Sequence, residues 1–190
     1  TRCQMFEDVK EINDIFNKDN SNDILFNLIH FNTRSLKNKL DDLIKFLDDF
    51  IFRFDIIAIS ESWLSDNDMD MISMNGYNYF GRNSLNKRGG GVGLFIQDKY
   101  DIKVRHDINN GLLSALEIFV VEIIGGSQIR NTVVVVAYRP PSSSVKVYCE
   151  LIDNVLTQLN EKNKNIIVTG DFNINLTVNM NENSNLLMEI

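Results

Sequence analysis

Asn165-Ile166-Ile167-Val168-Thr169-Gly170-Asp171-Phe172-Asn173 is an apolar segment of strand length that ends in glycine and polar residues. Residues 132–138 form an earlier segment of the same kind, and residues 145–159 between them have a helical pattern after a serine-rich cap region, residues 142–144. A strand, a helix and a strand in this order predict two parallel strands joined by a helical crossover.

The same order occurs earlier in the chain. Residues 24–31 and 54–60 have strand patterns, and Ser35 is placed to cap a helix over residues 36–52 between them. Shorter strands are expected between the two units, at residues 77–80, 92–96, 102–105 and 113–124. Two similar halves favour a layered α/β sandwich over a single doubly wound sheet.

The chain of 190 residues has the length of one ordinary domain. Residues 6–18 have helical spacing, and the polar residues 20–23 interrupt it. We therefore predict an N-terminal helix and linker over residues 1–23 and one α/β domain over residues 24–190.

Composition limits the function classes. The formal net charge is −7, which disfavours a dedicated DNA-binding module but allows an enzyme with metal-binding carboxylates and local basic patches. The patches, each of which could instead be a solvated face, are Arg34 with Lys37 and Lys39, Arg82 with Lys87 and Arg88, and Arg139. No apolar run approaches the ~20 residues of a membrane span, no signal-peptide pattern occurs, and the two cysteines favour reduced thiols in an intracellular protein.

Polar residues stand at the ends of the apolar strands, where a core would not tolerate them unpaired. Because ligands of open α/β sheets bind beyond the carboxyl ends of the strands, these residues are expected to meet at one rim. Mg²⁺ prefers oxygen ligands and needs only one or two carboxylates, so the set is suited to phosphate ester hydrolysis. The residues are Asn32, Glu61, Tyr138, Arg139, Asp171 and Asn173.

Simpler interpretations exist for each residue taken alone. An Asn or Asp at a strand end is usually a turn former or a helix cap. The glycines at 89–91 lack the Lys and Ser/Thr of a P-loop and are more typical of a turn. His30 is expected to be a packing residue and His106 a solvated one, since neither has a triad partner.

Five short motifs follow one another along the chain: residues 30–36 (HFNTRSL), 61–64 (ESWL), 89–92 (GGGV), 138–141 (YRPP) and 170–173 (GDFN). Any single motif is weak, but five in this order are specific. In this order they resemble the motifs of the endonuclease/exonuclease/phosphatase superfamily. The match is closest to the apurinic-like endonuclease domain of non-LTR (LINE-type) retrotransposon polyproteins.

This resemblance implies a four-layer, DNase I-like α/β sandwich and a nuclease that nicks DNA to prime reverse transcription. The implied cofactor is Mg²⁺, with Mn²⁺ as an alternative. The implied partners are DNA and a reverse transcriptase domain in the same polyprotein, and the implied location is the nucleus. No membrane association is expected.

The motifs also imply residue roles. Glu61 would bind the metal, and Asn32 would order the metal site and the phosphate. Tyr138 would contact the scissile phosphate. Asp171 would orient the attacking water, and Asn173 would hold the phosphate or the transition state.

Two arginines are predicted to bind DNA or phosphate. Arg34 stands where some relatives carry an acidic residue, so it is expected to face DNA or to support its loop. Arg139 belongs to the YRPP motif.

The superfamily also carries a late Asp and a Ser-Asp-His motif, and this sequence contains no Asp-His pair. We therefore expect a C-terminally truncated chain with an incomplete sandwich and impaired activity. Two alternatives to the DNA endonuclease stay open: a phosphatase of the same superfold, and an inactive or domesticated remnant that binds DNA or a protein.

Overall fold

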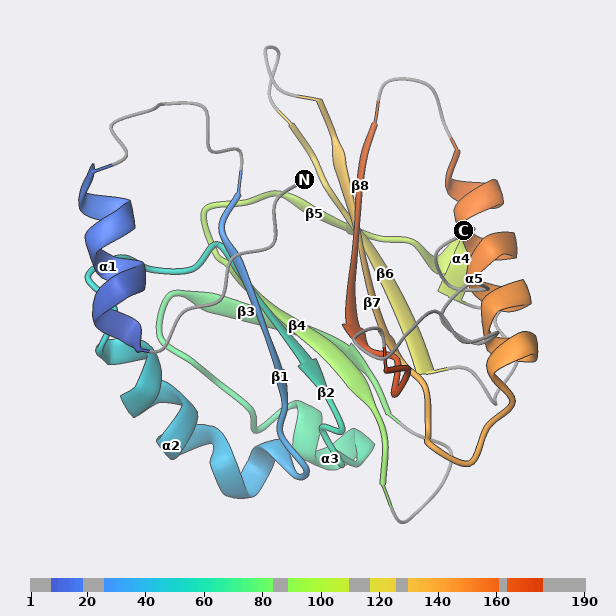
Figure 1. The fold of residues 1–190 in the computed structure, drawn as a ribbon, viewed down its shortest axis with the longest axis horizontal. Coiled ribbons are helices and arrows are strands. Elements are labelled where there is room, and N and C mark those ends of the chain that lie inside the picture. The colour runs from blue at the N-terminus through green and yellow to red at the C-terminus, as the bar shows by residue number, and fades with distance from the viewer. Residues whose placement is uncertain are drawn as a thin grey trace.

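Two strand–helix–strand units build the molecule, one in each half of the chain. The computed structural model describes residues 8–18, 26–83, 89–109, 117–125, 130–160 and 164–175. Figure 1 shows four layers: helices α1 (Val9–Lys18) and α2 (Leu36–Asp48), two sheets that face each other, and helix α5 (Val145–Leu159). The predicted four-layer α/β sandwich is confirmed.

The first sheet has the strand order β1-β2-β4-β3 among the described residues. Strands β1 and β2 are parallel, with α2 as their crossover, and β4 is antiparallel to both β2 and β3. All five residues of β2 are buried, because this strand is central and has a packed layer on each face. The strands are β1 (Leu28–Asn32), β2 (Ile56–Ser60), β3 (Tyr77–Arg82) and β4 (Val92–Gln97).

The second sheet has the order β5-β6-β7-β8 in the described part of the chain. Strands β7 and β8 are parallel and are joined by α5, and β6 is antiparallel to β5 and β7. Two short helices, α3 (Asp66–Met69) and α4 (His106–Asn109), lie in connections. The strands are β5 (Ile102–Val104), β6 (Glu117–Ile123), β7 (Thr132–Tyr138) and β8 (Asn165–Asp171).

Alternating side chains of the central strands divide between two apolar layers. In β7, Val134 and Val136 face the first sheet, whereas Val133 and Val135 pack against α5. Residues of α2 cover the outer face of the first sheet in the same way. The strand ends are thereby held in fixed positions between packed layers.

The predicted boundaries agree best in the second half, where β7 and α5 have the expected limits. Helix α2 ends at Asp48 instead of residue 52, because Phe50 packs edge-on against Phe46, Phe52 and Phe54 beyond the helix end. The last strand was expected over residues 165–169, but β8 continues through Gly170 and Asp171, since both still pair with β7. Residues 24–25 and 113–116 of the expected strands lie outside the described residues.

Ser35 is the N-cap residue of α2, as expected, but its φ is 91° and its side chain makes no cap hydrogen bond. A side-chain cap requires extended backbone at this position, which a left-handed residue does not have. The backbone N–H of Ser35 instead donates to the Glu61 carbonyl at 2.9 Å.

Helix α1 confirms the expected N-terminal helix over its described residues. The rings of Phe16 and Phe52 stack with their centroids 3.9 Å apart. The Asn13 side chain donates to the Asp49 carbonyl and accepts the Ile51 N–H. The division of the chain at residue 24 stays a prediction.

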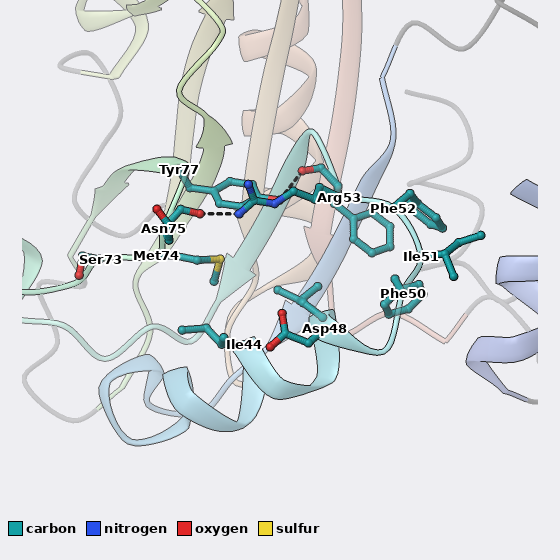
Figure 2. A pocket seen from close by; sticks show the side chains of 12 residues that line it. Ile44, Asp48, Phe50, Ile51, Phe52, Arg53, Ser73, Met74, Asn75 and Tyr77 are labelled. Carbon is teal, nitrogen blue, oxygen red and sulfur yellow. Dashed lines mark hydrogen bonds between the residues drawn. The ribbon is translucent and has the colours of Figure 1, made fainter.

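A cavity of about 500 Å³ lies at the amino end of β2, between the end of α2 and the start of β3. Figure 2 shows its aromatic and aliphatic lining and the Arg53 guanidinium. Arg53 donates to the Asn75 carbonyl at 2.6 Å and lies over the Tyr77 ring. This cavity is at the opposite end of β2 from the polar strand ends.

No helix within the described ranges has the length and apolar character needed to cross a membrane.

Candidate active site

The polar strand ends of the two sheets meet through one amide. The Asn32 Nδ2 atom, at the end of β1, lies 2.7 Å from Glu61 Oε1 and 2.8 Å from Asp171 Oδ2. Glu61 directly follows β2 in the same sheet, whereas Asp171 ends β8 in the other sheet. The parallel strand pairs bring their carboxyl ends to one rim, as the sequence predicted.

This amide fixes two carboxylates that would otherwise repel each other. An NH₂ group has two N–H donors, so Asn32 can donate to both partners at once. Hydrogen bonds to charged carboxylates are stronger than neutral ones. Asn32 is itself exposed and Glu61 and Asp171 are half-buried, so both carboxylates keep some contact with solvent.

Tyr138 lies at the same rim with its phenol against Glu61. Burial raises the pKa of this phenol well above its ordinary value, and the hydrogen bond to Glu61 and the charges of Glu117 and Asp171 raise it further. Tyr138 therefore keeps its proton at neutral pH and acts as a hydrogen-bond donor.

Glu117 is a residue of this rim that the sequence analysis missed. It begins β6, pairs with Tyr138 in the sheet and is only 8% exposed. Its Oε2 accepts the Gly91 N–H at 2.7 Å, and a Cβ on Gly90, whose φ is 83°, would overlap its carboxylate. The sequence feature that could have revealed Glu117 is a carboxylate placed directly before the apolar residues 118–121 of a predicted strand.

The loop after β2 is held by main-chain bonds. Ser62 N–H donates to the Gly91 carbonyl at 3.1 Å, and Trp63 N–H donates to the Gly90 carbonyl at 2.9 Å. The carbonyls of Glu61 and Ser62 accept the first N–H groups of α2, each at 2.9 Å. The glycine segment thus anchors the loop that carries Glu61, consistent with the predicted turn.

The loop after β8 is held by side chains. The guanidinium of Arg139 donates to the carbonyls of Phe172 at 2.7 Å, Asn173 at 2.6 Å and Ser143 at 2.6 Å. The Asn173 Nδ2 donates to the Arg139 carbonyl at 2.9 Å, and its N–H donates to Asp171 Oδ1 at 3.0 Å.

Arg139 is 4% exposed and is surrounded by main-chain carbonyls. Its direct effect is to fix the segment that carries Asp171 and Asn173. The phosphate-binding role expected for Arg139 stays a prediction, and so do the roles expected for the other site residues.

His30 lies deeper in the same region, in β1. Its Nε2 is 3.0 Å from Ser60 Oγ, and burial lowers the pKa of its imidazole while the Asp171 charge opposes that shift. His30 helps to line an open groove of about 750 Å³ together with Asn32, Asp171 and Asn173. It therefore packs within the sheet, as expected, and also borders the site.

The basic residues are placed differently from one another. Arg34 is exposed on the loop after β1, and its φ is 43°. Lys37 pairs with Asp68 at 2.6 Å, and Arg82 donates to the Asn109 carbonyl at 3.0 Å. Lys87 and Arg88 lie outside the described residues.

The donor set fits a hard divalent cation that keeps most of its water. Within the described ranges, no three Asp, Glu, His or Cys side chains form a metal-binding group. Mg²⁺ is commonly held by one or two carboxylates with water in the remaining positions. Glu61 offers such a carboxylate beside Asn32, and Asp171 offers a second across the rim.

Two facing mixed sheets between helices, with carboxylates and amides at the joined strand ends, define the class of DNase I-like α/β sandwiches. Residues 29–180 match the profile of the Endonuclease/Exonuclease/phosphatase family. The chain belongs to this family, whose members are hydrolytic nucleases and phosphatases.

Solved structures share the fold at low sequence identity. The endonuclease domain of TRAS1, a telomere-specific non-LTR retrotransposon, is similar with a TM-score of 0.65 and 17% identity, over 86% of this chain and 70% of that domain. An AP endonuclease from Archaeoglobus fulgidus is similar with a TM-score of 0.59 and 16% identity, over 87% and 70% of the two chains.

The Xenopus laevis APE2 catalytic domain is similar with a TM-score of 0.58 and 14% identity. The matched region covers 85% of this chain and 66% of that domain. No curated protein matches the chain in sequence. These structural similarities establish the fold.

Proposed function

We propose that this chain is a Mg²⁺-dependent phosphodiester hydrolase that nicks DNA, as the endonuclease part of a non-LTR retrotransposon polyprotein. The observation that carries the proposal is the Asn32 amide between Glu61 and Asp171, which joins a carboxylate of each sheet at one accessible rim. The similarity to the TRAS1 endonuclease domain supports the choice of DNA as substrate.

Glu61 would hold the cation, either Mg²⁺ or Mn²⁺, with Asn32 fixing the orientation of the carboxylate. A bound Mg²⁺ would supply positive charge to polarise the phosphate. Asp171, held by Asn32 and by the Asn173 N–H, would accept a hydrogen bond from the attacking water and orient it.

Tyr138 and Asn173 would act as hydrogen-bond donors to the phosphate. The raised pKa of Tyr138 suits this role, because a protonated phenol can donate to a non-bridging oxygen where negative charge develops. Asn173 would first have to exchange its present bond to the Arg139 carbonyl.

A supercoiled-plasmid nicking assay tests the proposal. With Mg²⁺, the chain should nick, and Glu61→Gln and Asp171→Ala should each lower the rate by about 10³-fold. EDTA should abolish the reaction. Asp153→Asn, which changes an exposed carboxylate on α5, is the matched control and should nick at the parental rate.

Nicking that persists in EDTA, or in both site variants, would contradict the proposal. Because phosphatases share this fold, release of phosphate from small phosphomonoesters is measured as a second readout. Phosphate release without nicking would favour a phosphatase. DNA binding without any hydrolysis would indicate a non-catalytic remnant instead. A nuclear location and a reverse transcriptase domain in the same polyprotein also belong to this proposal.

A further inference from the structure

Left-handed backbone is concentrated at the candidate site. Within the described residues, every non-glycine residue with positive φ lies in the loop after β1, β2 or β8. Such conformations cost about 1–3 kcal/mol each and persist at functional sites where the surroundings impose them. The residues are Arg34, Ser35, Glu61, Trp63 and Asn173.

Trp63 is the member of this set that the site chemistry leaves without a role. It is the sole tryptophan of the chain, its φ is 52°, and the residue is 46% exposed. Its neighbours Ser62 and Leu64 are buried. The fold therefore anchors the backbone on both sides and leaves a large aromatic surface facing solvent.

The indole has a defined place beside the glycine segment. The main-chain N–H of Trp63 donates to the Gly90 carbonyl, and a Cβ on Gly89 would lie 3.4 Å from the indole Nε1 of Trp63. On the other side of that segment, Gly91 N–H bonds Glu117, the strand partner of Tyr138. Trp63 thus lies at the edge of the site, two residues after Glu61.

An exposed cation lies on the adjoining loop. This cation is Arg34, on the loop after β1. Two main-chain bonds join this loop to the loop after β2. The Ser35 N–H donates to the Glu61 carbonyl, and the Leu36 N–H donates to the Ser62 carbonyl. An aromatic face and a guanidinium on two connected loops are the two groups that single-stranded nucleic acid binding uses, for bases and for phosphates respectively.

We propose that Trp63 is a stacking platform for an unpaired nucleobase of the bound strand, with Arg34 contacting a neighbouring phosphate. This inference rests on the proposed action on DNA and specifies the kind of DNA. A base inside a duplex is already stacked on both faces, so an indole reaches it only where the base is unpaired or displaced. The net charge of −7 leaves less general phosphate attraction, which makes a stacking contribution more important.

The intrinsic fluorescence of Trp63 provides a direct test, because no other tryptophan contributes to the signal. The chain would be titrated at low salt, without a divalent cation, with a 12-nucleotide oligothymidylate. The comparison ligands are a blunt duplex and a fully abasic 12-mer with the same number of phosphates. We expect saturable quenching by the oligothymidylate and little quenching by the abasic 12-mer or the duplex.

Anisotropy of a labelled oligothymidylate measures affinity independently of the indole signal. Trp63→Ala should weaken binding about tenfold, and Trp63→Phe should stay within about threefold of the parental Kd. Ile51→Ala is the matched control, since Ile51 is 59% exposed and lines the cavity at the far end of β2 (Figure 2). That variant should bind like the parent.

Equal quenching by the abasic 12-mer and the oligothymidylate, or an unchanged Kd in Trp63→Ala, would overturn the inference. Such a result would leave the nicking proposal standing, because nicking is measured separately. Quenching without nicking in Mg²⁺ would support the inference and count against the hydrolase. Absence of binding to every DNA would overturn the inference, and the plasmid assay with Mg²⁺ would still decide the nicking proposal by itself.

Discussion

The loops after β2 and β8 each present one carboxylate to the same rim, but they are held in different ways. Strand β2 lies between β1 and β4, and the Glu61 loop is fixed by main-chain bonds to the glycine segment and to the start of α2. In the described part of the second sheet, β8 is the last strand, and the Asp171 loop is fixed by the side chains of Arg139 and Asn173.

Strands β2 and β8 also differ in how far their side chains are exposed to solvent. All of β2 is buried, whereas Ile166 and Val168 of β8 are 38% and 37% exposed. A central strand has neighbours on both sides that supply main-chain partners. The loop at the end of β8 depends on individual side chains, so single substitutions should disturb Asp171 more readily than Glu61.

The largest effect is expected from Gly170→Ala in β8. Its φ is 143°, and a Cβ would overlap the carbonyl oxygen of Ala137 on the paired strand, so the backbone must shift. We expect the free energy of unfolding to fall by about 3 kcal/mol, measured by urea denaturation.

Gly76→Ala is the matched control in the first half. Gly76 also has positive φ, 78°, but its added Cβ would approach only the far end of a long side chain, 2.9 Å from Arg53 Nη1. We expect a loss of about 1 kcal/mol. Equal losses in both variants would mean that the close contact with β7 contributes nothing.

A smaller effect on stability is expected from Arg139→Met. This change leaves the carbonyls of Phe172, Asn173 and Ser143 without their donor, at an expected loss of about 2 kcal/mol. The kcat of nicking should fall more than tenfold because Asp171 is less well positioned, while KM changes little.

The salt dependence of DNA binding separates positioning from phosphate contact. Arg139→Met should leave the slope of log Kd against log salt unchanged, whereas Arg34→Met should reduce it by about 0.7 for the single-stranded oligothymidylate. A reduced slope for Arg139→Met would instead establish the phosphate contact that its motif implies.

The smallest effects are expected at the two crossover helices. The Ser144 side chain accepts the Val147 N–H and caps α5, so Ser144→Ala should cost about 1 kcal/mol. Ser35→Ala should change the stability by less than about 0.5 kcal/mol, because that side chain makes no cap bond. Thermal unfolding followed by circular dichroism measures both, and a larger loss at Ser35 would refute the main-chain anchoring of α2.

The strand and helix order could be predicted because it follows from local patterns. Thr132–Tyr138 is a continuous apolar run of strand length, and Val145–Leu159 has helical spacing, so the limits of both were correct. The end of α2 was misplaced because the aromatic residues after Asp48 continue a helical pattern while packing against one another outside the helix.

The candidate site was predictable as a set of strand ends but not as a set of contacts. Asn32, Glu61, Tyr138 and Asp171 meet as expected, since parallel strands carry their ends to the same side. Glu117 was missed because an antiparallel strand delivers its first residue, not its last, to that rim.

The sequence alone determined the order of the main strands and crossover helices, the similarity of the two halves and most of the residues gathered at one rim, because apolar patterns and strand direction are local properties. Only the tertiary structure decided that Asn32 bridges two sheets, that Arg139 is buried among carbonyls and that the Trp63 indole stays exposed. Those outcomes depend on which groups approach from distant segments, and hydrogen-bond partners 29 to 139 residues apart leave no mark in a local pattern.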